Sequence, residues 1–453
     1  MYLRMRVFVF VVVFLAFCTI ASSPPATAAS SSVPTLPDGP LRVDDCVRIA
    51  LGRNFSVVNA REGVRESQGA QLAAISSFAP HISSGGSFAR RIQGPQEFYV
   101  AEFDLTFKTD RLSSDTYSYN IQATQNLLSV SDWANISSAG HSVRAARYSL
   151  DLARQTVAYQ VKAQFYELLK ATKLAEVSRG AMELSEDELR RANALYEVGS
   201  VAKGDVLKAK VRVSQSELEL IGAENRVKLE RSRLAKLMGL PVETALEIVE
   251  DLGRETPQVE VEDPVKLALK RRPDVLAARE NLKGADASRF ASKAARFPSV
   301  YSSLQYSWSD NSFPETWDSH RKNYSWNVRL GLNVPIFDGL SIAAGIRQAT
   351  ARAAMMDNEM KETELQAALE VKEALLVLDE ATKRIAASKS GLASAEEDYR
   401  LSRERYDVGS GTMLELLDAE VSLSLARSSH VEALASLRVA EALLEKATGE
   451  PAE

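Results

Sequence analysis

The chain has 453 residues, of which 45% are hydrophobic, 25% charged and only 7% aromatic, and its formal net charge at pH 7 is −5. This composition is typical of a folded chain and excludes disordered and collagen-like proteins. The slightly acidic balance also argues against nucleic-acid binding, which needs an excess of Lys and Arg.

The first segment in chain order has the features of an export signal. Arg4 and Arg6 supply a positive start, and the apolar run Val7–Ile20 that follows is too short for a comfortable membrane span. Ala26-Thr27-Ala28 fits a leader-peptidase site. Residues 1–28 are therefore predicted to be a signal peptide.

Lipid attachment at Cys18 is the alternative, but the residue before a lipidated Cys is usually small, and here it is Phe17. After plain cleavage only Cys46 remains, so we expect no intrachain disulfide.

The rest of the chain contains two copies of one unit of about 200 residues. The stretch Tyr196–Pro241 aligns without a gap to Tyr406–Pro451, at a spacing of 406 − 196 = 210. Besides the Tyr and Pro at its ends, eleven positions recur identically: Val198, Gly199, Ser200, Leu207, Ala209, Val211, Ser214, Ala223, Leu234, Lys236 and Gly239. We divide the chain into a first repeat (41–241), an acidic linker (242–263) and a second repeat (264–451).

Each repeat contains the same predicted elements in the same order. A helix of moderate length comes first, from Asp44 to about Ser77 and again from Pro264 to about Arg296. A β segment follows, and then a very long helix, Asp132–Val198 or Gly339–Val408, which would span about 100 Å at 1.5 Å per residue. A short Gly-Ser break and a further helix complete the unit. Apolar, Ala, Ser and Gln positions at helical spacing indicate close helix packing.

The β segments show strict alternation. In residues 324–334, six apolar residues alternate with polar residues or Gly: Tyr324, Trp326, Val328, Leu330, Leu332 and Val334. Alternation of this length, with aromatic residues near the strand ends, is the signature of a lipid-facing transmembrane strand. A half-buried sheet in a soluble protein is the alternative.

Four such strands are predicted, near Ile82–Arg90, Thr116–Asn126, Ser299–Ser309 and Tyr324–Val334. The segment Glu97–Phe107 could extend the first hairpin or form an external loop. Four strands cannot close a barrel, since about eight is the smallest number that does. Open sheet edges in lipid are costly, so we expect three chains to share one twelve-stranded barrel.

The repeats and their motifs resemble the outer-membrane efflux channel family typified by TolC. The similarity extends from Leu41 to Pro451, and its most specific parts are Arg272-Pro273-Asp274-Val275, Asn333-Val334-Pro335-Ile336-Phe337-Asp338-Gly339 and the two Tyr-x-Val-Gly-Ser turns. The resemblance implies a mixed α and β membrane protein. It would be a homotrimer with a 12-strand β-barrel, four strands per chain, in the outer-membrane lipid of a Gram-negative bacterium. A long α-helical barrel would continue through the periplasm, with the linker at its equator.

The two Gly-Ser breaks become the turns at the far periplasmic tip. Gly199 and Gly409 would provide the left-handed backbone that ends a helix. In the second turn Thr412 and Glu415 have capping-box spacing. The first turn has Ala202 instead and relies on Asp205 near the positive helix end.

The resemblance also implies functional residues at the tip. A periplasmic adaptor protein would dock on Val198, Gly199, Ser200, Val408, Gly409, Ser410 and Thr412. Tyr406, Asp205, Glu415 and Asp418 would form the periplasmic gate, with acidic rings that favour cations. The family's partner Arg is replaced by Gly411. The alternative is that Glu415 is only a cap and Asp418 only a solvated charge.

The residues indicate a passive conduit and not an enzyme. His81, His141, His320 and His430 occur singly, and no phosphate loop or nucleophile motif is visible, so no catalytic, cofactor or metal site is predicted. The expected function is the outer-membrane channel of a tripartite system, with an adaptor and an inner-membrane transporter of the RND, ABC or MFS type. Small-molecule efflux is favoured. A duct for type I protein secretion and a structural periplasmic coiled coil are the alternatives.

Overall fold

The computed structural model describes residues 39–249, 252, 263–312 and 322–451. The predicted signal peptide and Cys18 lie outside the described residues, as do residues 250–251 and 253–262 of the linker and His320. Among the described residues, no helix has both the length and the apolar character needed to cross a bilayer.

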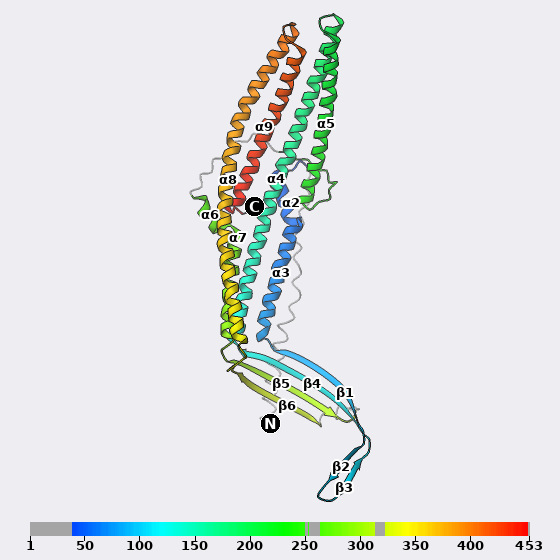
Figure 1. Cartoon of the computed structure of the whole chain (residues 1–453), viewed down its shortest axis with the longest axis vertical. Helices are drawn as coiled ribbons and strands as arrows, with labels where there is room; N and C mark the ends of the chain where they lie inside the picture. Colours follow the sequence, from blue (N-terminus) through cyan, green and yellow to red (C-terminus); the bar gives the residue numbers. More distant parts are fainter. Residues whose placement is uncertain (1–38, 250–251, 253–262, 313–321, 452–453) are drawn as a thin grey trace.

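Two hairpins of long helices form the body of the molecule (Figure 1). The first pairs α4 (Val130–Glu197) with α5 (Lys203–Leu237), and the second pairs α8 (Ser341–Asp407) with α9 (Met413–Thr448). Both hairpin turns lie at the same end of the molecule, farthest from the sheet. The 68 residues of α4 span about 100 Å. The two very long helices are thus confirmed, with ends within two residues of the predicted ones.

Small side chains let these helices approach closely. Most of the buried residues of α8 are alanines: Ala349, Ala353, Ala367, Ala374 and Ala381. Since a helix gains little from propensity alone, this packing provides most of the stability of so long an element.

The moderate-length helices differ from the prediction, because each is broken near its start. The first is divided into α2 (Val43–Arg53), α3 (Phe55–Ile75) and a short 3₁₀ turn, η1 (Ser76–Phe78). Asn54 has a ψ of 129°, and its side-chain oxygen accepts a hydrogen bond from the Ser56 amide at 2.8 Å. A side chain used in this way caps a new helix and does not continue the old one.

The second moderate helix is broken at the corresponding position in the repeat. It consists of α6 (Pro264–Arg271) and α7 (Pro273–Ala294), with Arg272 in an extended conformation. The Pro273 ring disfavours a helical conformation for the residue before it. The prediction of one continuous helix was therefore wrong in both repeats for local reasons.

A four-stranded antiparallel sheet lies at the opposite end from the tip turns (Figure 1). Its order is β1 (His81–Gln93), β4 (Leu112–Leu128), β5 (Ser299–Asp310) and β6 (Tyr324–Asn333). All four strands were predicted, although β1 and β4 are longer than expected. Within the described chain, β1 and β6 are each hydrogen-bonded on one side only.

The strand register gathers the predicted apolar residues on one face. Ile121 lies opposite Tyr306, which in turn lies opposite Trp326, and the rings of Tyr306 and Trp326 are 5.0 Å apart. The other face carries serine pairs across strands, such as Ser307 and Ser325 at 2.8 Å. On the β6 edge the apolar side chains are largely exposed: Trp326, Val328, Leu330 and Leu332.

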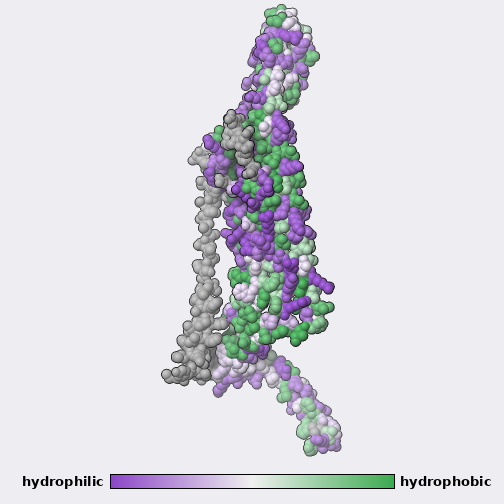
Figure 2. Space-filling view, turned by 90° about the vertical axis from the view of Figure 1, so that its left-hand side faces the viewer, coloured by the Kyte–Doolittle hydropathy of each residue, from purple (hydrophilic) through white to green (hydrophobic). Residues whose placement is uncertain are grey.

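Exposed apolar side chains continue at the junction between the sheet and the helices. Phe290, Phe297, Ile336 and Phe337 are all more than half exposed. Figure 2 shows hydrophobic side chains gathered at this end of the helices, whereas the opposite tip is largely hydrophilic on the face in view.

The segment predicted as either a strand extension or a loop forms a separate two-stranded hairpin. Strands β2 (Gln96–Val100) and β3 (Leu105–Thr109) pair with each other beyond the ends of β1 and β4 (Figure 1).

The main hydrophobic core of the described residues lies at mid-height and is built mostly from the first repeat. Phe165 and Leu168 of α4, Val47 of α2 and Leu234 of α5 are fully buried there. Leu41 joins the linker through a bridge to Ile248.

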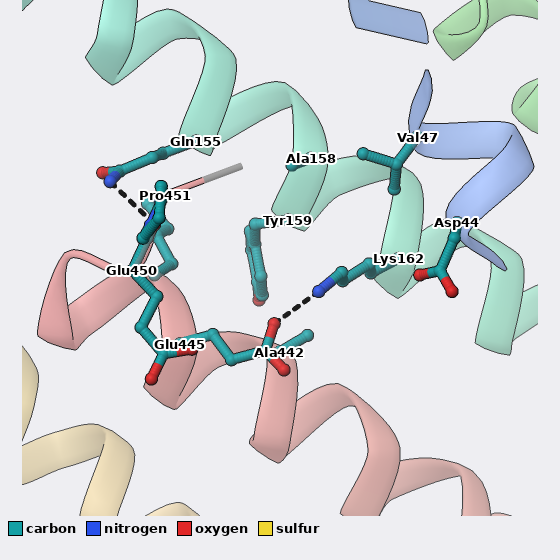
Figure 3. A pocket seen from close by; sticks show the side chains of 11 residues that line it. Asp44, Val47, Gln155, Ala158, Tyr159, Lys162, Ala442, Glu445, Glu450 and Pro451 are labelled. Carbon is teal, nitrogen blue, oxygen red and sulfur yellow. Dashed lines mark hydrogen bonds and ion pairs between the residues drawn. The ribbon is translucent and has the colours of Figure 1, made fainter. Parts of the chain in front are cut away.

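Beside this core is a cavity of about 360 Å³ between α2, α4 and the end of α9 (Figure 3). Gln155 donates a hydrogen bond to the Glu450 carbonyl at 2.8 Å, and Lys162 pairs with Glu445 at 2.5 Å. Lys446 lies 5.3 Å from the centre of the Tyr159 ring. Lys162 and Lys446 thus both have partners within the cavity. These contacts attach the end of the second repeat to the first repeat.

Candidate functional site at the helical tips

The two tip turns have the same backbone design. Gly199 and Gly409 have φ angles of 79° and 75°, in the left-handed region. In the first turn the Ser200 amide donates to the Leu195 carbonyl at 2.8 Å, and the second turn makes the equivalent bond at 2.9 Å. The bonds satisfy carbonyls that a helix end leaves without partners. The predicted helix ends at both glycines are confirmed.

The proposed docking residues lie at the outermost point of each hairpin. Val198 and Val408 are largely exposed despite being apolar, and Ser200 and Ser410 beside them are also exposed. The Ser410 hydroxyl donates back to the Arg405 carbonyl at 3.2 Å. Each turn is therefore closed by backbone hydrogen bonds and exposes one valine side chain.

The second turn is capped as predicted. The Thr412 hydroxyl accepts from the Glu415 amide, and the Glu415 carboxylate accepts from the Thr412 amide, each at 3.2 Å. Arg405 lies 3.9 Å from the same carboxylate. In the first turn Ala202 makes no side-chain cap. Glu415 therefore has a structural role in the monomer, whatever else it does.

The four proposed gate residues fall into two pairs. Glu415 and Asp418 are exposed one turn apart on α9. Tyr406 is buried at the end of α8, and its hydroxyl has no hydrogen-bond partner among the described residues. Burial raises the pKa of Tyr406, and the nearby charge of Asp205 on α5 adds to that effect. The structure thus brings Asp205 and Tyr406 together across the two hairpins.

A buried polar cluster lies beneath the tips and was not predicted from the sequence. Each of the four long helices contributes one member: Glu188 from α4, Arg212 from α5, Tyr399 from α8 and Glu420 from α9. The Tyr399 hydroxyl donates to Glu188 Oε1 at 3.1 Å, and Arg212 Nε donates to Glu420 Oε1 at 3.2 Å. Both contacts cross from one helical hairpin to the other.

The two carboxyl groups of this cluster are strongly desolvated. Glu188 is 3% exposed and Glu420 is 1% exposed, and the second oxygen of each has no hydrogen-bond partner in the described structure. Burial, followed by the charge of Glu420, raises the pKa of Glu188 to about 8. Glu188 is therefore protonated at neutral pH, while Glu420 is paired with Arg212.

Sequence reasoning missed this cluster because its members are far apart in the chain. Tyr399 is one of the apolar positions at helical spacing that we interpreted as packing positions. This interpretation is only partly correct, because the Tyr399 ring packs in the core whereas its hydroxyl donates a hydrogen bond to Glu188. Carboxyl residues on the buried face of a long helix were the available signal.

In the described parts of the chain, no group of three or more His, Cys, Asp or Glu side chains could hold a metal ion.

A family model described as "Outer membrane efflux protein" matches residues 46–240 and 265–450. The chain belongs to the outer membrane efflux protein family. The resemblance found in its repeats and turns is thereby confirmed. This family consists of channel proteins and not enzymes, and it functions in the outer membrane.

Individual relatives in this family are distant but cover most of the chain. The pyoverdine export outer membrane protein OpmQ of Pseudomonas aeruginosa is 24% identical over 418 residues, which is 91% of this chain and 85% of the relative. The CmeC outer membrane channel of Campylobacter jejuni superposes with a TM-score of 0.79 at 16% identity, over 90% of this chain and 85% of that chain. The MtrE outer membrane channel of Neisseria gonorrhoeae gives 0.76 at 21%, over 90% and 89%. At such identities the solved structures establish a shared fold.

Proposed function

We propose that this protein is the trimeric outer-membrane channel of a tripartite export system. In this role three copies conduct substrates passively from an inner-membrane pump to the outside. One observation carries the proposal: an open four-stranded sheet with one apolar, exposed face is joined to helices about 100 Å long.

The sheet supports the trimer. Its edge strands β1 and β6 need partners, because unpaired backbone groups are costly in lipid. Three copies that join β6 of one protomer to β1 of the next close a twelve-stranded barrel, which a single chain cannot do. Trp326, Val328, Leu330 and Leu332 then face lipid, and the serine-rich face lines the channel.

The helices support a tunnel through the periplasm. In the trimer the four long helices of each copy form a continuous wall, and the linker 242–263 lies at its equator between the two repeats. The tip turns dock a periplasmic adaptor through Val198, Val408 and the residues beside them. The adaptor connects the channel to a transporter of the RND, ABC or MFS type.

The tunnel entrance is closed by the gate residues at the tips. Glu415 and Asp418 repeat around the threefold axis as acidic rings, while Tyr406 packs between the two hairpins behind them, near the charge of Asp205. Crowded carboxylates in a narrow pore attract cations and repel anions.

Small molecules are the favoured substrates. The support is the relative OpmQ, which is named as a pyoverdine export outer membrane protein.

An export assay tests the proposal. A bacterial host that lacks its own channel should regain efflux of a fluorescent dye when it produces this protein together with its adaptor and pump. Leu330→Asp, on the apolar face, should abolish efflux, whereas Asn327→Asp, on the polar face of the same strand, should retain it. Equal activity of the two variants would contradict the lipid-facing assignment, and secretion of a protein instead of the dye would identify a type I duct.

A further inference from the structure

The β2–β3 hairpin has two chemically distinct faces. Register places Phe98 opposite Phe107, and Leu105 lies on the same face two pairs further along. On the other face Glu97 and Lys108 form an ion pair at 2.6 Å, and the hydroxyl of Tyr99 donates to Asp104 at 2.9 Å.

The apolar face of this hairpin has no cover in the described chain. Phe98 and Leu105 are each 53% exposed, Phe107 is 56% exposed and Phe103, in the turn, is 71% exposed. A two-stranded hairpin alone in water is marginally stable at best. Several exposed large apolar side chains on one small hairpin therefore indicate a partner.

The apolar alternation of the hairpin has the same phase in the sequence as that of the sheet. Two residues separate β1 from β2, and two separate β3 from β4, so neither link shifts this phase. Phe88 and Phe98 both occupy even-numbered positions, and Phe107 and Tyr117 both occupy odd-numbered positions. Phe88 lies opposite Tyr117 in the sheet, just as Phe98 lies opposite Phe107 in the hairpin. Phe88 and Tyr117 belong to the face that meets lipid in the proposed channel.

The position of the hairpin indicates which part of the membrane it meets. It projects from the end of the sheet farthest from the helices, and there it turns away from the direction of β1 and β4 (Figure 1). If the helices lie in the periplasm, this end is at the outer leaflet. An arm that folded inward over the pore would turn its apolar face to water, whereas an arm folded outward turns that face to the membrane.

We propose that the β2–β3 hairpin is a lipid-binding arm whose apolar face, formed by Phe98, Leu105 and Phe107, lies in the boundary between headgroups and acyl chains of the outer leaflet. Aromatic side chains prefer this boundary, because it accommodates an apolar ring beside polar groups. Glu97 and Lys108 then face water. This inference rests on the proposed channel function.

Adjacent residues of β3 provide a matched test. Leu105→Cys and Thr106→Cys place a thiol on the apolar and polar faces of the same strand. The native Cys46 does not interfere, because it is buried and its pKa is raised to about 12, chiefly by that burial. Each full-length variant is labelled with a nitroxide and reconstituted into vesicles of phosphatidylethanolamine and phosphatidylglycerol.

Collision rates with oxygen, which partitions into lipid, and with a water-soluble nickel chelate are then measured by electron paramagnetic resonance. For the label at 105 we expect a several-fold higher ratio of oxygen to nickel collisions than for the label at 106. Equal ratios at the two positions would overturn the proposal. Strong dipolar broadening between labels at 105 would also overturn it, since that would show three hairpins packed against one another.

Two further measurements keep the outcome decisive. If Leu105→Cys does not assemble, Phe107→Cys reports on the same apolar face. Trimer mass and single-channel conductance are recorded on the same samples. A conducting trimer with water-exposed labels would refute the arm and leave the channel standing, whereas a sample without trimers would refute the channel itself.

Discussion

Replacement of Glu188 by Gln should remove a specific pH dependence from the stability of the helical domain. The folded protein keeps a proton on Glu188 up to about pH 8, whereas an unfolded chain releases it near the ordinary glutamate pKa of 4.5. Between these values the folded state binds more protons, so stability is greatest below the lower pKa and is lost as pH rises toward the upper one.

The magnitude follows from the two pKa values. At 1.36 kcal/mol for each tenfold change in the ionisation equilibrium, a pKa raised from 4.5 to about 8 corresponds to about 5 kcal/mol in total. From about pH 5.5 to about pH 8.5, the wild type should lose about 3 kcal/mol of this. Gln preserves an acceptor for the Tyr399 hydroxyl and has no proton to lose, so Glu188→Gln should be the more stable protein at the upper pH.

Urea denaturation of the detergent-solubilised protein, followed by circular dichroism at a series of pH values, measures the effect. Glu183→Gln is the matched control, because Glu183 is exposed on the same helix. It should follow the wild type at every pH. If Glu188→Gln shows the same loss of stability with pH as the wild type, the carboxyl pair does not hold a proton and the reasoning is refuted.

Three further predictions concern the turns, the gate and the sheet. Gly409→Pro should preserve membrane insertion but abolish dye efflux, because Pro cannot adopt the positive φ of the docking turn; normal efflux would contradict the docking role. Neutralising Glu415 to Gln and Asp418 to Asn together should reduce cation selectivity, measured as a reversal potential across a planar bilayer under a salt gradient. Wild-type selectivity in this double variant would mean that Glu415 is only a helix cap and Asp418 only a surface charge. Gly331→Val should block assembly in heat-modifiability gels, because even a Cβ at this position would lie 2.4 Å from the Tyr301 ring; a fully assembled variant would show that this ring moves freely.

Local chemistry explains which parts of the fold were predictable. The tip turns follow from Gly199 and Gly409, and the capping box from the three-residue spacing of Thr412 and Glu415. The faces of the sheet follow from alternation alone, because strand geometry fixes which side chains share a face.

The helix breaks were predictable in principle but were missed. Pro273 is a known boundary signal for the residue before it. The equivalent break has only Asn54 as its cue, and an Asn in a helical pattern has no such unique meaning. The division of the chain into two repeats and a linker is still an interpretation.

Other features depend mainly on tertiary arrangement. The Glu188 cluster exists only where four helices meet, so no single stretch of sequence reveals it. Whether segment 97–107 extends the first hairpin also depended on how the chain bends between β1 and β2. The gate and docking roles of the tip residues depend on a trimer axis and on partners, which one chain does not contain.

The mass of the assembled particle tests the central claim most directly. Native mass spectrometry of the full-length protein, extracted in detergent from purified outer membranes, should give one species with three times the mass of the processed chain. A stable monomer from the soluble fraction would contradict the trimeric channel, because its sheet edges would then need no neighbours.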